Sequence, residues 1–306
     1  VLSIVPIIMK PRHPRAVEAT TKCFLIQALA ATLILLGSII NTWDSGLWTM
    51  MNTSSYTATT LITIAVTLKL GIAPVHFWYP EVLQATTMNT AMILSTWQKL
   101  APLTLLYMMS NHLPPQTLLT LGLISTLIGG LMGLNQTQTR KIMAFSSINH
   151  MGWLMITITL NLNLTTLMLT MYISMTASIF LSLNQSNTPT LSTMTNTWTT
   201  SPTLTVMMTA TLLSLSGLPP LSGFMPKWLT LTELINHNLI PIATTIALTT
   251  LPNLFFYLRM MHLTTMTTPP SNINTQLKWN SNSTTQNSPL TFLLTLTLLP
   301  IQPLLY

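Results

Sequence analysis

The chain has 306 residues, and only 5% of them are charged, with 11 basic and 4 acidic side chains. Soluble domains carry about 25% charged residues, so the composition argues against a soluble fold. Mean hydropathy is +0.54, and repeated apolar runs of about 20 residues predict an all-α, polytopic membrane helix bundle. These runs are long and continuous, unlike the short alternating segments of a membrane β-barrel.

The formal net charge is +7, but the basic residues do not cluster with aromatic residues on a polar domain. Nucleic acid is therefore not expected as a partner. The single cysteine, Cys23, excludes an internal disulfide and a cysteine-based metal site. The sequence contains no phosphate-binding glycine loop, paired-cysteine motif, serine–histidine–acid arrangement or haem motif. We expect no cofactor, no metal and no redox site in this chain.

The predicted elements form a series of membrane spans within a single transmembrane domain, residues 1–306. Residues 1–9 are apolar but too few to cross a bilayer, and we interpret them as the tail of a truncated helix. The full spans are expected at about residues 22–42, 56–84, 88–109, 115–134, 141–160, 163–184, 203–236, 239–261 and 288–305. The segments 56–84 and 203–236 are too long for one straight crossing, and a polar loop is expected before residue 202.

When the loops are numbered alternately, one side of the membrane receives every basic residue that lies outside the spans. These are Lys10, Arg12, Arg15, Lys22, Arg140, Lys141, Arg259 and Lys278. The positive-inside rule predicts that this side faces the cytoplasm or the mitochondrial matrix. The three remaining basic residues, Lys69, Lys99 and Lys227, lie inside predicted spans.

The two long segments are predicted to be discontinuous helices, because each contains residues that break a helix. In the first, Lys69 precedes the breaking residues Gly71, Pro74 and Pro80. In the second, the breaking residues Gly217, Pro219, Pro220 and Gly223 precede Lys227. The second segment lies five spans after the first, so the two should run antiparallel, with each lysine on a similar side of its break. Interrupted segments at matching positions point to an inverted-repeat transporter.

Lysines within the membrane are expensive, and this cost indicates a function. A lysine at mid-bilayer costs about 2.5–3.5 kcal/mol, so three cost on the order of 7–10 kcal/mol. Broken helices free backbone groups and admit water at mid-membrane, where a lysine can load and release a proton. These features predict a proton relay through Lys69, Lys99, His150 and Lys227.

The same residues also have plainer interpretations. The lysines could form structural ion pairs, although four acidic residues hardly suffice as partners. Glu81 and Glu233 lie near the ends of the two long segments and could be lysine partners or interfacial charges. His150 could be a hydrogen-bonded packing residue, and His76 is expected to brace the first break.

Four motifs carry a family resemblance. They are residues 69–81 (KLGIAPVHFWYPE), 96–102 (TWQKLAP), 133–153 (GLNQTQTRKIMAFSSINHMGW) and 215–228 (LSGLPPLSGFMPKW). In this order they resemble the antiporter-like subunits of respiratory complex I, in particular the chain 2 family of animal mitochondrial NADH–ubiquinone oxidoreductase. The resemblance covers essentially the whole chain. It implies inverted five-helix repeats with discontinuous helices at the two broken segments.

By motif position, the resemblance implies that Lys69, Lys99 and Lys227 are proton-path lysines and that His150 lies on a polar axis. NADH, FMN, iron–sulfur clusters and ubiquinone are implied for the assembled complex, and none of them for this chain. The implied partners are other membrane subunits of complex I, the lipid bilayer, protons and water. The implied location is the mitochondrial inner membrane, with basic loops facing the matrix. The family's membrane glutamate, expected to pair with the first lysine, would fall upstream of Val1.

The expected function is therefore proton translocation coupled to NADH-to-ubiquinone electron transfer elsewhere in the complex. The chain would be a subunit of an enzyme while holding no redox site itself. An alternative is a stand-alone cation/proton antiporter of the same ancestry, although a cation site would need more membrane carboxylates. A third possibility is a passive assembly scaffold whose lysines only pair with their neighbours.

Overall fold

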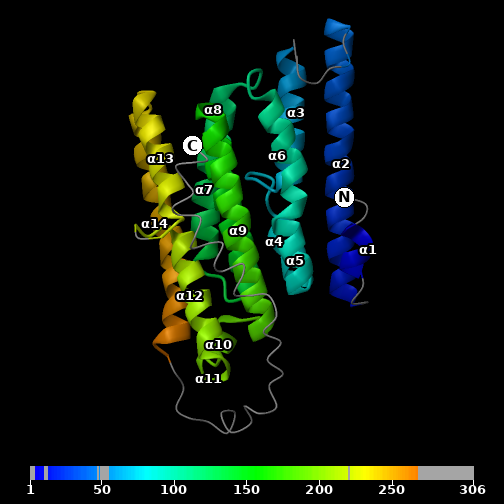
Figure 1. Cartoon of the computed structure of the whole chain (residues 1–306). Coiled ribbons are helices and arrows are strands. Elements are labelled where there is room, and N and C mark those ends of the chain that lie inside the picture. The colour runs from blue at the N-terminus through cyan, green and yellow to red at the C-terminus, as the bar shows by residue number, and fades with distance from the viewer. Residues whose placement is uncertain (1–3, 10–12, 47, 49–54, 220, 268–306) are drawn as a thin grey trace.

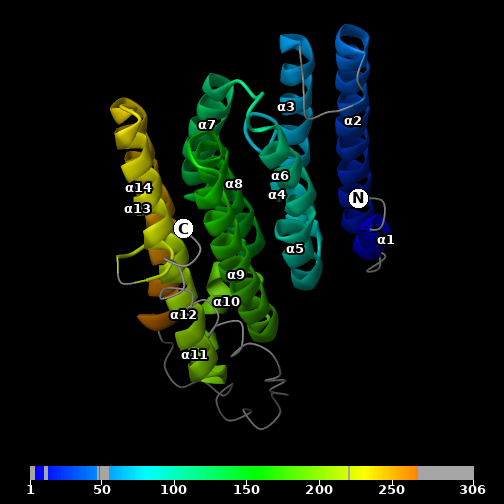
Figure 2. The same ribbon diagram turned by 45° about the horizontal axis from the view of Figure 1, so that its top comes forward.

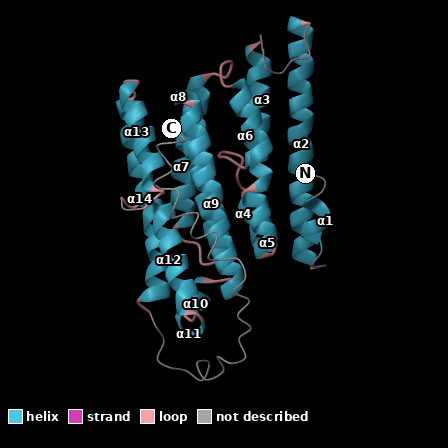
Figure 3. Ribbon diagram, in the orientation of Figure 1, coloured by secondary structure: helices cyan, strands magenta, loops and turns pink. Residues whose placement is uncertain are grey.

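The structure is a computed structural model that describes residues 4–9, 13–46, 48, 55–219 and 221–267. Within these ranges the chain folds into helices and contains no β-strand, so the all-α class is confirmed. The helices lie side by side in an elongated bundle (Figures 1 and 3). The last predicted span at 288–305 lies outside the described residues. The predicted helix-breaking residue Pro220 also lies outside them, as do the basic loop residues Lys10, Arg12 and Lys278.

The chain begins with the short helix α1 (Ile4–Met9), which packs against the long helix α2 (Pro14–Ser45). Pro14 lies in the first turn of α2, where its missing N–H is not needed. The helix ends at Gly46, whose left-handed φ of 70° lets its N–H bond back to the carbonyl of Thr42. At 32 residues α2 is longer than the predicted span 22–42 and long enough to cross a bilayer.

The first discontinuous helix consists of α3 (Tyr56–Leu70) and α4 (Trp78–Ala85). Gly71 ends α3 with a left-handed φ of 70°, and the chain then runs through Pro74 before α4 begins. Pro80 was predicted to break the helix, but it lies in the first turn of α4. First-turn residues need no backbone donor, so this proline begins the second half-helix instead of interrupting it.

The second discontinuous helix repeats this construction with α12 (Pro202–Ser216) and α13 (Phe224–Asn236). Gly217 ends α12 with a φ of 81°, and Gly223 is the N-cap of α13. Pro226 is the third residue of α13, as Pro80 is the third residue of α4. Pro219 lies exposed in the connection. The two discontinuous helices are thus confirmed, and α3 and α12 start from opposite ends of the bundle (Figure 1).

The segment 88–109, expected as one span, is divided at Thr96 into α5 (Met88–Ser95) and α6 (Trp97–Met109). The hydroxyls of Ser95 and Thr96 both donate to the carbonyl of Met92, at 2.9 and 2.8 Å. Such side-chain bonds compete with the helical backbone pattern. Pro102 lies inside α6 and supplies no backbone donor. This interruption was not predicted from the sequence, and it lies three residues before Lys99.

The remaining helices surround a buried central one. They are α7 (Pro115–Gly133), α8 (Thr139–Leu160), α9 (Leu162–Ser186), the short α10 (Leu191–Met194) and α11 (Thr197–Thr200), and α14 (Ile240–Thr265). The short helices lie where only a loop was expected. Nearly all residues of α8 are buried, and it packs against α4, α5, α7, α9 and α13. Polar groups on α8 therefore face protein on every side.

Four described helices, α2, α7, α9 and α14, are long and apolar enough to cross a membrane. The described basic residues outside the discontinuous segments and α6 gather at one end of the bundle, where α2 and α8 begin and α14 ends (Figures 1 and 2). The guanidinium of Arg140 donates to the carbonyl of Thr86. That of Arg259 donates to Leu134 at 3.0 Å. The end of the bundle that carries Arg15, Lys22, Arg140, Lys141 and Arg259 is called the basic end below.

Candidate functional site

The three span lysines occupy three different helices and differ in burial. Lys99 on α6 is 3% exposed and Lys227 on α13 is 7% exposed, so both ammonium groups lie inside the bundle. Lys69 lies in the last turn of α3 and is partly buried. Lys69 and Lys227 each belong to the half-helix that lies farther from the basic end, as the antiparallel arrangement predicted.

Lys99 is held by neutral groups. Its Nζ donates to the phenol oxygen of Tyr172 at 3.3 Å. The same nitrogen lies 4.7 Å from the ring centroid of Tyr79 and 5.3 Å from that of Tyr172, where cation–π attraction operates. No described carboxylate forms an ion pair with it. Among the described residues, the buried amine of Lys99 therefore has a phenol and two aromatic faces as partners and no carboxylate.

Tyr172 on α9 was not identified from the sequence, yet it is central to the site. Its hydroxyl donates to the carbonyl of Ser95 at 2.8 Å, at the end of α5. The interruption at Thr96 exposes this carbonyl to a side-chain donor. A buried tyrosine hydroxyl usually finds a partner, so a lone tyrosine within an apolar span was the available signal.

His150 lies near the middle of α8 and is 7% exposed. Its ring centroid is 5.6 Å from that of Tyr172. Its Nε2 is buried and makes no hydrogen bond to any described residue. Tyr172 therefore contacts both His150 and Lys99, because its hydroxyl accepts the hydrogen bond from the Lys99 amine.

Lys227 links the two halves of the second discontinuous helix, because it lies on α13 and bonds to the end of α12. Its Nζ donates to the carbonyls of Ser216 at 3.0 Å and Leu215 at 3.3 Å, in the last turn of α12. The negative end of a helix favours a cation there. A Cβ atom at Gly217 would lie 2.8 Å from this Nζ, so a larger residue would displace the amine of Lys227, and the positive φ of this position favours glycine in any case.

Lys69 and His76 belong to the first break. The carbonyl of Lys69 accepts a hydrogen bond from Nε2 of Gln27 at 3.3 Å, which ties α3 to α2. His76 is 2% exposed, its Nδ1 lies 3.2 Å from the carbonyl of Pro74, and its ring makes a tilted contact with that of Phe77, with centroids 4.3 Å apart. Within the described residues no hydrogen bond or ion pair joins Lys69 to Lys99, and His76 packs as a brace of the connection.

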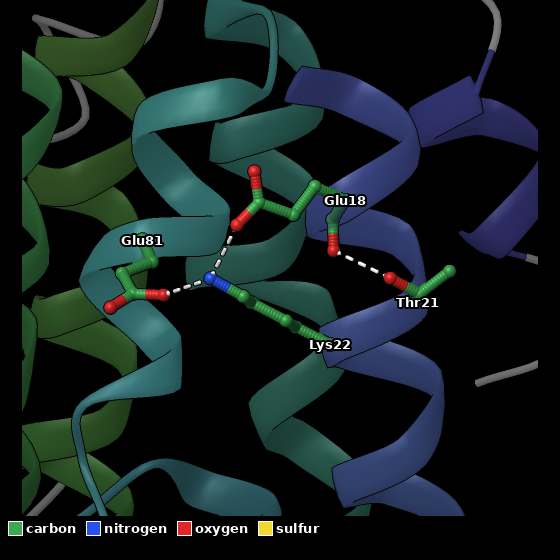
Figure 4. A network of polar contacts seen from close by, with 4 residues as sticks. All are labelled: Glu18, Thr21, Lys22 and Glu81. Atoms are coloured by element: carbon green, nitrogen blue, oxygen red, sulfur yellow. Dashed lines mark hydrogen bonds and ion pairs between the residues drawn. The ribbon is translucent and has the colours of Figure 1, made fainter. Parts of the chain in front are cut away.

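The two acidic candidates differ in their surroundings. Glu81 in the first turn of α4 pairs with Lys22 of α2 at 2.7 Å, and Lys22 pairs with Glu18 at the same distance (Figure 4). Glu81 is therefore a partner of an interfacial lysine and not of a span lysine. Glu233 lies in the last turn of α13 and is partly buried. The described residues contain no cluster of ligands that could hold a metal.

Two further buried polar side chains lie inside the bundle. Asn149 on α8 and Asn253 on α14 are each 1% exposed. Nδ2 and Oδ1 of Asn149 and Oδ1 of Asn253 make no hydrogen bond to a described residue. Buried polar atoms normally have partners, either protein or ordered water. The arrangement is thus a polar core crossing α6, α9, α8 and α13 inside an apolar bundle.

Comparisons with known proteins agree with this architecture. The family model described as NADH:quinone oxidoreductase/Mrp antiporter, TM, matches residues 1–251, and NADH dehydrogenase subunit 2 C-terminus matches residues 254–306. NADH-ubiquinone oxidoreductase chain 2 of Struthio camelus is 49% identical over 305 residues, covering 99% of this chain and 88% of the relative.

Solved structures share the fold. A chain of respiratory complex I from Thermus thermophilus aligns with a TM-score of 0.83 at 24% identity, covering 96% of this chain and 69% of that one. A chain of the Mrp complex from a Dietzia species aligns with a TM-score of 0.78 at 17% identity, covering 95% and 67%. The antiporter-like fold is thus confirmed, and the chain belongs to the NADH-ubiquinone oxidoreductase chain 2 family.

Proposed function

We propose that this chain is the proton-translocating membrane subunit of a mitochondrial complex I and moves protons through Lys99, His150 and Lys227, with Lys69 at one end. Family membership makes it a subunit of an enzyme whose redox work is done elsewhere. NADH, FMN, iron–sulfur clusters and ubiquinone belong to the assembled complex. The basic end faces the matrix, following the positive-inside rule.

One observation carries the proposal: two buried lysines, each beside a helix interruption, share the interior of the bundle with a buried histidine on the central helix α8. Lys99 follows the break at Thr96, and Lys227 donates to the carbonyls before the break at Gly217. A structural ion pair would need a buried carboxylate, and none pairs with either lysine among the described residues. The ammonium groups are instead held by a phenol, aromatic faces and helix-end carbonyls, which leave the proton free to be exchanged.

Proton transfer between these groups requires water, because the heavy atoms are not all in hydrogen-bond contact. Nε2 of His150 and the amide of Asn149 are buried and have no hydrogen-bond partner among the described residues, and ordered water would satisfy them. When His150 is neutral and Lys227 is an uncharged amine, a proton held on Lys99 passes to such a water, then to His150, and then to the amine of Lys227, which leaves Lys99 neutral. Each charge moved across the membrane is worth about 2.3 kcal/mol per 100 mV.

The test is Lys99→Met and Lys227→Met in the assembled complex, reconstituted in liposomes, with protons moved per NADH oxidised as the readout. The relay predicts fewer protons per NADH in both variants. Lys22→Met is the matched control, since Lys22 is an interfacial lysine on α2 and should leave this ratio unchanged. Unchanged coupling in both span variants would favour a passive scaffold.

The stand-alone antiporter remains the competing function. It predicts that the isolated chain exchanges a cation for protons, with a dependence on the counter-ion. Its support is weaker, because the Mrp chain is 17% identical whereas the chain 2 relative is 49% identical. Cation-dependent proton exchange by the isolated chain in liposomes would favour the antiporter.

A further inference from the structure

An open cavity of about 370 Å³ lies at the basic end, between the start of α2, the half-helix α4 and the start of α8. Its charged lining consists of Arg15, Glu18, Lys22, Glu81 and Lys141. Ligand pockets start at about 300 Å³, so this cavity is large enough for a small polar group. It is separate from the lysines and histidine of the proposed relay.

The charges in this cavity are unequally partnered. Lys22 takes both carboxylates, Glu18 and Glu81, each at 2.7 Å (Figure 4). Arg15 and Lys141 form no ion pair with any described residue. Three cations and two carboxylates leave a net charge of +1. One monoanionic group would balance it, bound by the two cations that lack a carboxylate.

We propose that this cavity binds the phosphate of an anionic phospholipid headgroup. A guanidinium fork such as that of Arg15 matches phosphate oxygens, and Lys141 adds a point charge. Basic pockets between membrane helices on the matrix side are suited to such headgroups. Leu25 lies three residues after Lys22, on the same side of α2, and is 64% exposed, so an acyl chain has apolar surface beside the cavity.

The ion pairs of Lys22 with Glu18 and Glu81 also determine which lipid headgroup fits the cavity. The ammonium of a zwitterionic headgroup would need a carboxylate, but Lys22 already occupies both. A headgroup without a cation, such as that of phosphatidylglycerol, therefore fits better than phosphatidylethanolamine. Soluble inorganic phosphate shares the anion chemistry but gains nothing from the apolar surface of α2.

The test uses the assembled complex in phosphatidylcholine nanodiscs that contain a phosphatidylglycerol probe with a photoreactive headgroup. Crosslinks to the peptides around Arg15 and Lys141 are quantified by mass spectrometry. Arg15→Gln and Lys141→Gln should each reduce labelling about fivefold, since a basic residue near the membrane surface contributes about 1 kcal/mol. Lys141→Arg should retain labelling, and Arg259→Gln, which removes a charge at the same end outside the cavity, should leave it unchanged.

Two further arms decide the ligand. A phosphatidylethanolamine probe should label these peptides less than phosphatidylglycerol does, and equal labelling would contradict the stated preference. Inorganic phosphate at millimolar concentration should not displace the lipid probe. Displacement would assign the cavity to soluble phosphate, and equal labelling of the wild type and both glutamine variants would overturn the site. None of these readouts depends on proton pumping, so the outcome is independent of the proposed relay.

Discussion

The ammonium of Lys99 bonds to the phenol of Tyr172 at 3.3 Å, although the two residues are 73 positions apart in the sequence. The phenol hydroxyl donates its own hydrogen bond to the carbonyl of Ser95 at 2.8 Å, so its oxygen is left to accept from Lys99. Tyr172 also lies against the ring of His150. One neutral side chain therefore links the interrupted span, the buried lysine and the histidine.

Replacing Tyr172 with phenylalanine should weaken proton translocation. The variant keeps the aromatic face but removes the hydrogen bond to Lys99, and a bond to a charged group is worth about 1.5–3 kcal/mol. The charged form of Lys99 should become less favourable by that order, and protons moved per NADH should fall. Tyr107→Phe on α6 is the control, because Tyr107 lines a separate pocket. Full coupling in Tyr172→Phe would remove Tyr172 from the proposed relay.

Gly217→Ala should impair the complex more than the same change at Gly46. Both glycines end a helix with positive φ, 81° and 70°, so both variants carry left-handed strain of about 1–2 kcal/mol. A Cβ at Gly46 meets nothing within 4 Å, whereas at Gly217 it would lie 2.8 Å from Nζ of Lys227. Thermal stability should drop in both variants, but pumping should fall only in Gly217→Ala. Equal pumping would mean that the position of the Lys227 ammonium is not critical.

The sequence was sufficient to predict features that depend on local chemistry. Glycine and proline act within a few residues, so both helix breaks could be located, although the first-turn position of Pro80 was misread as a break. The burial of Lys99 and Lys227 could also be predicted, because each lies inside an apolar run long enough to cross a bilayer. The sidedness of the basic residues followed from the same pattern of runs and loops.

Features that depend on packing between distant helices could not be predicted. The interruption at Thr96 depends on two hydroxyls that bond to Met92 and on Tyr172 capturing the carbonyl of Ser95. The sequence around residue 96 does not indicate that Tyr172, on another helix, would bond to the carbonyl of Ser95. The partner of Glu81 was likewise undetermined, because Lys22 lies 59 residues away on α2.

Glu81→Gln should change stability little and leave proton translocation intact. The side chains of Lys22 and Glu81 are 41% and 54% exposed, and exposed ion pairs contribute about 0.2–1 kcal/mol. A double-mutant cycle of Lys22→Met and Glu81→Gln, read by thermal unfolding of the complex, should give a coupling energy in that range. The coupling should shrink in about 1 M salt, where the screening length falls to about 3 Å.

The reason to expect intact pumping is geometric. Glu81 lies at the basic end and contacts Lys22, while the buried lysines are held by Tyr172 and by the carbonyls of α12. Lys22→Met supplies the comparison, since it removes the same ion pair from the other side. A loss of protons per NADH in Glu81→Gln but not in Lys22→Met would contradict this assignment and place the carboxylate itself on the proton path.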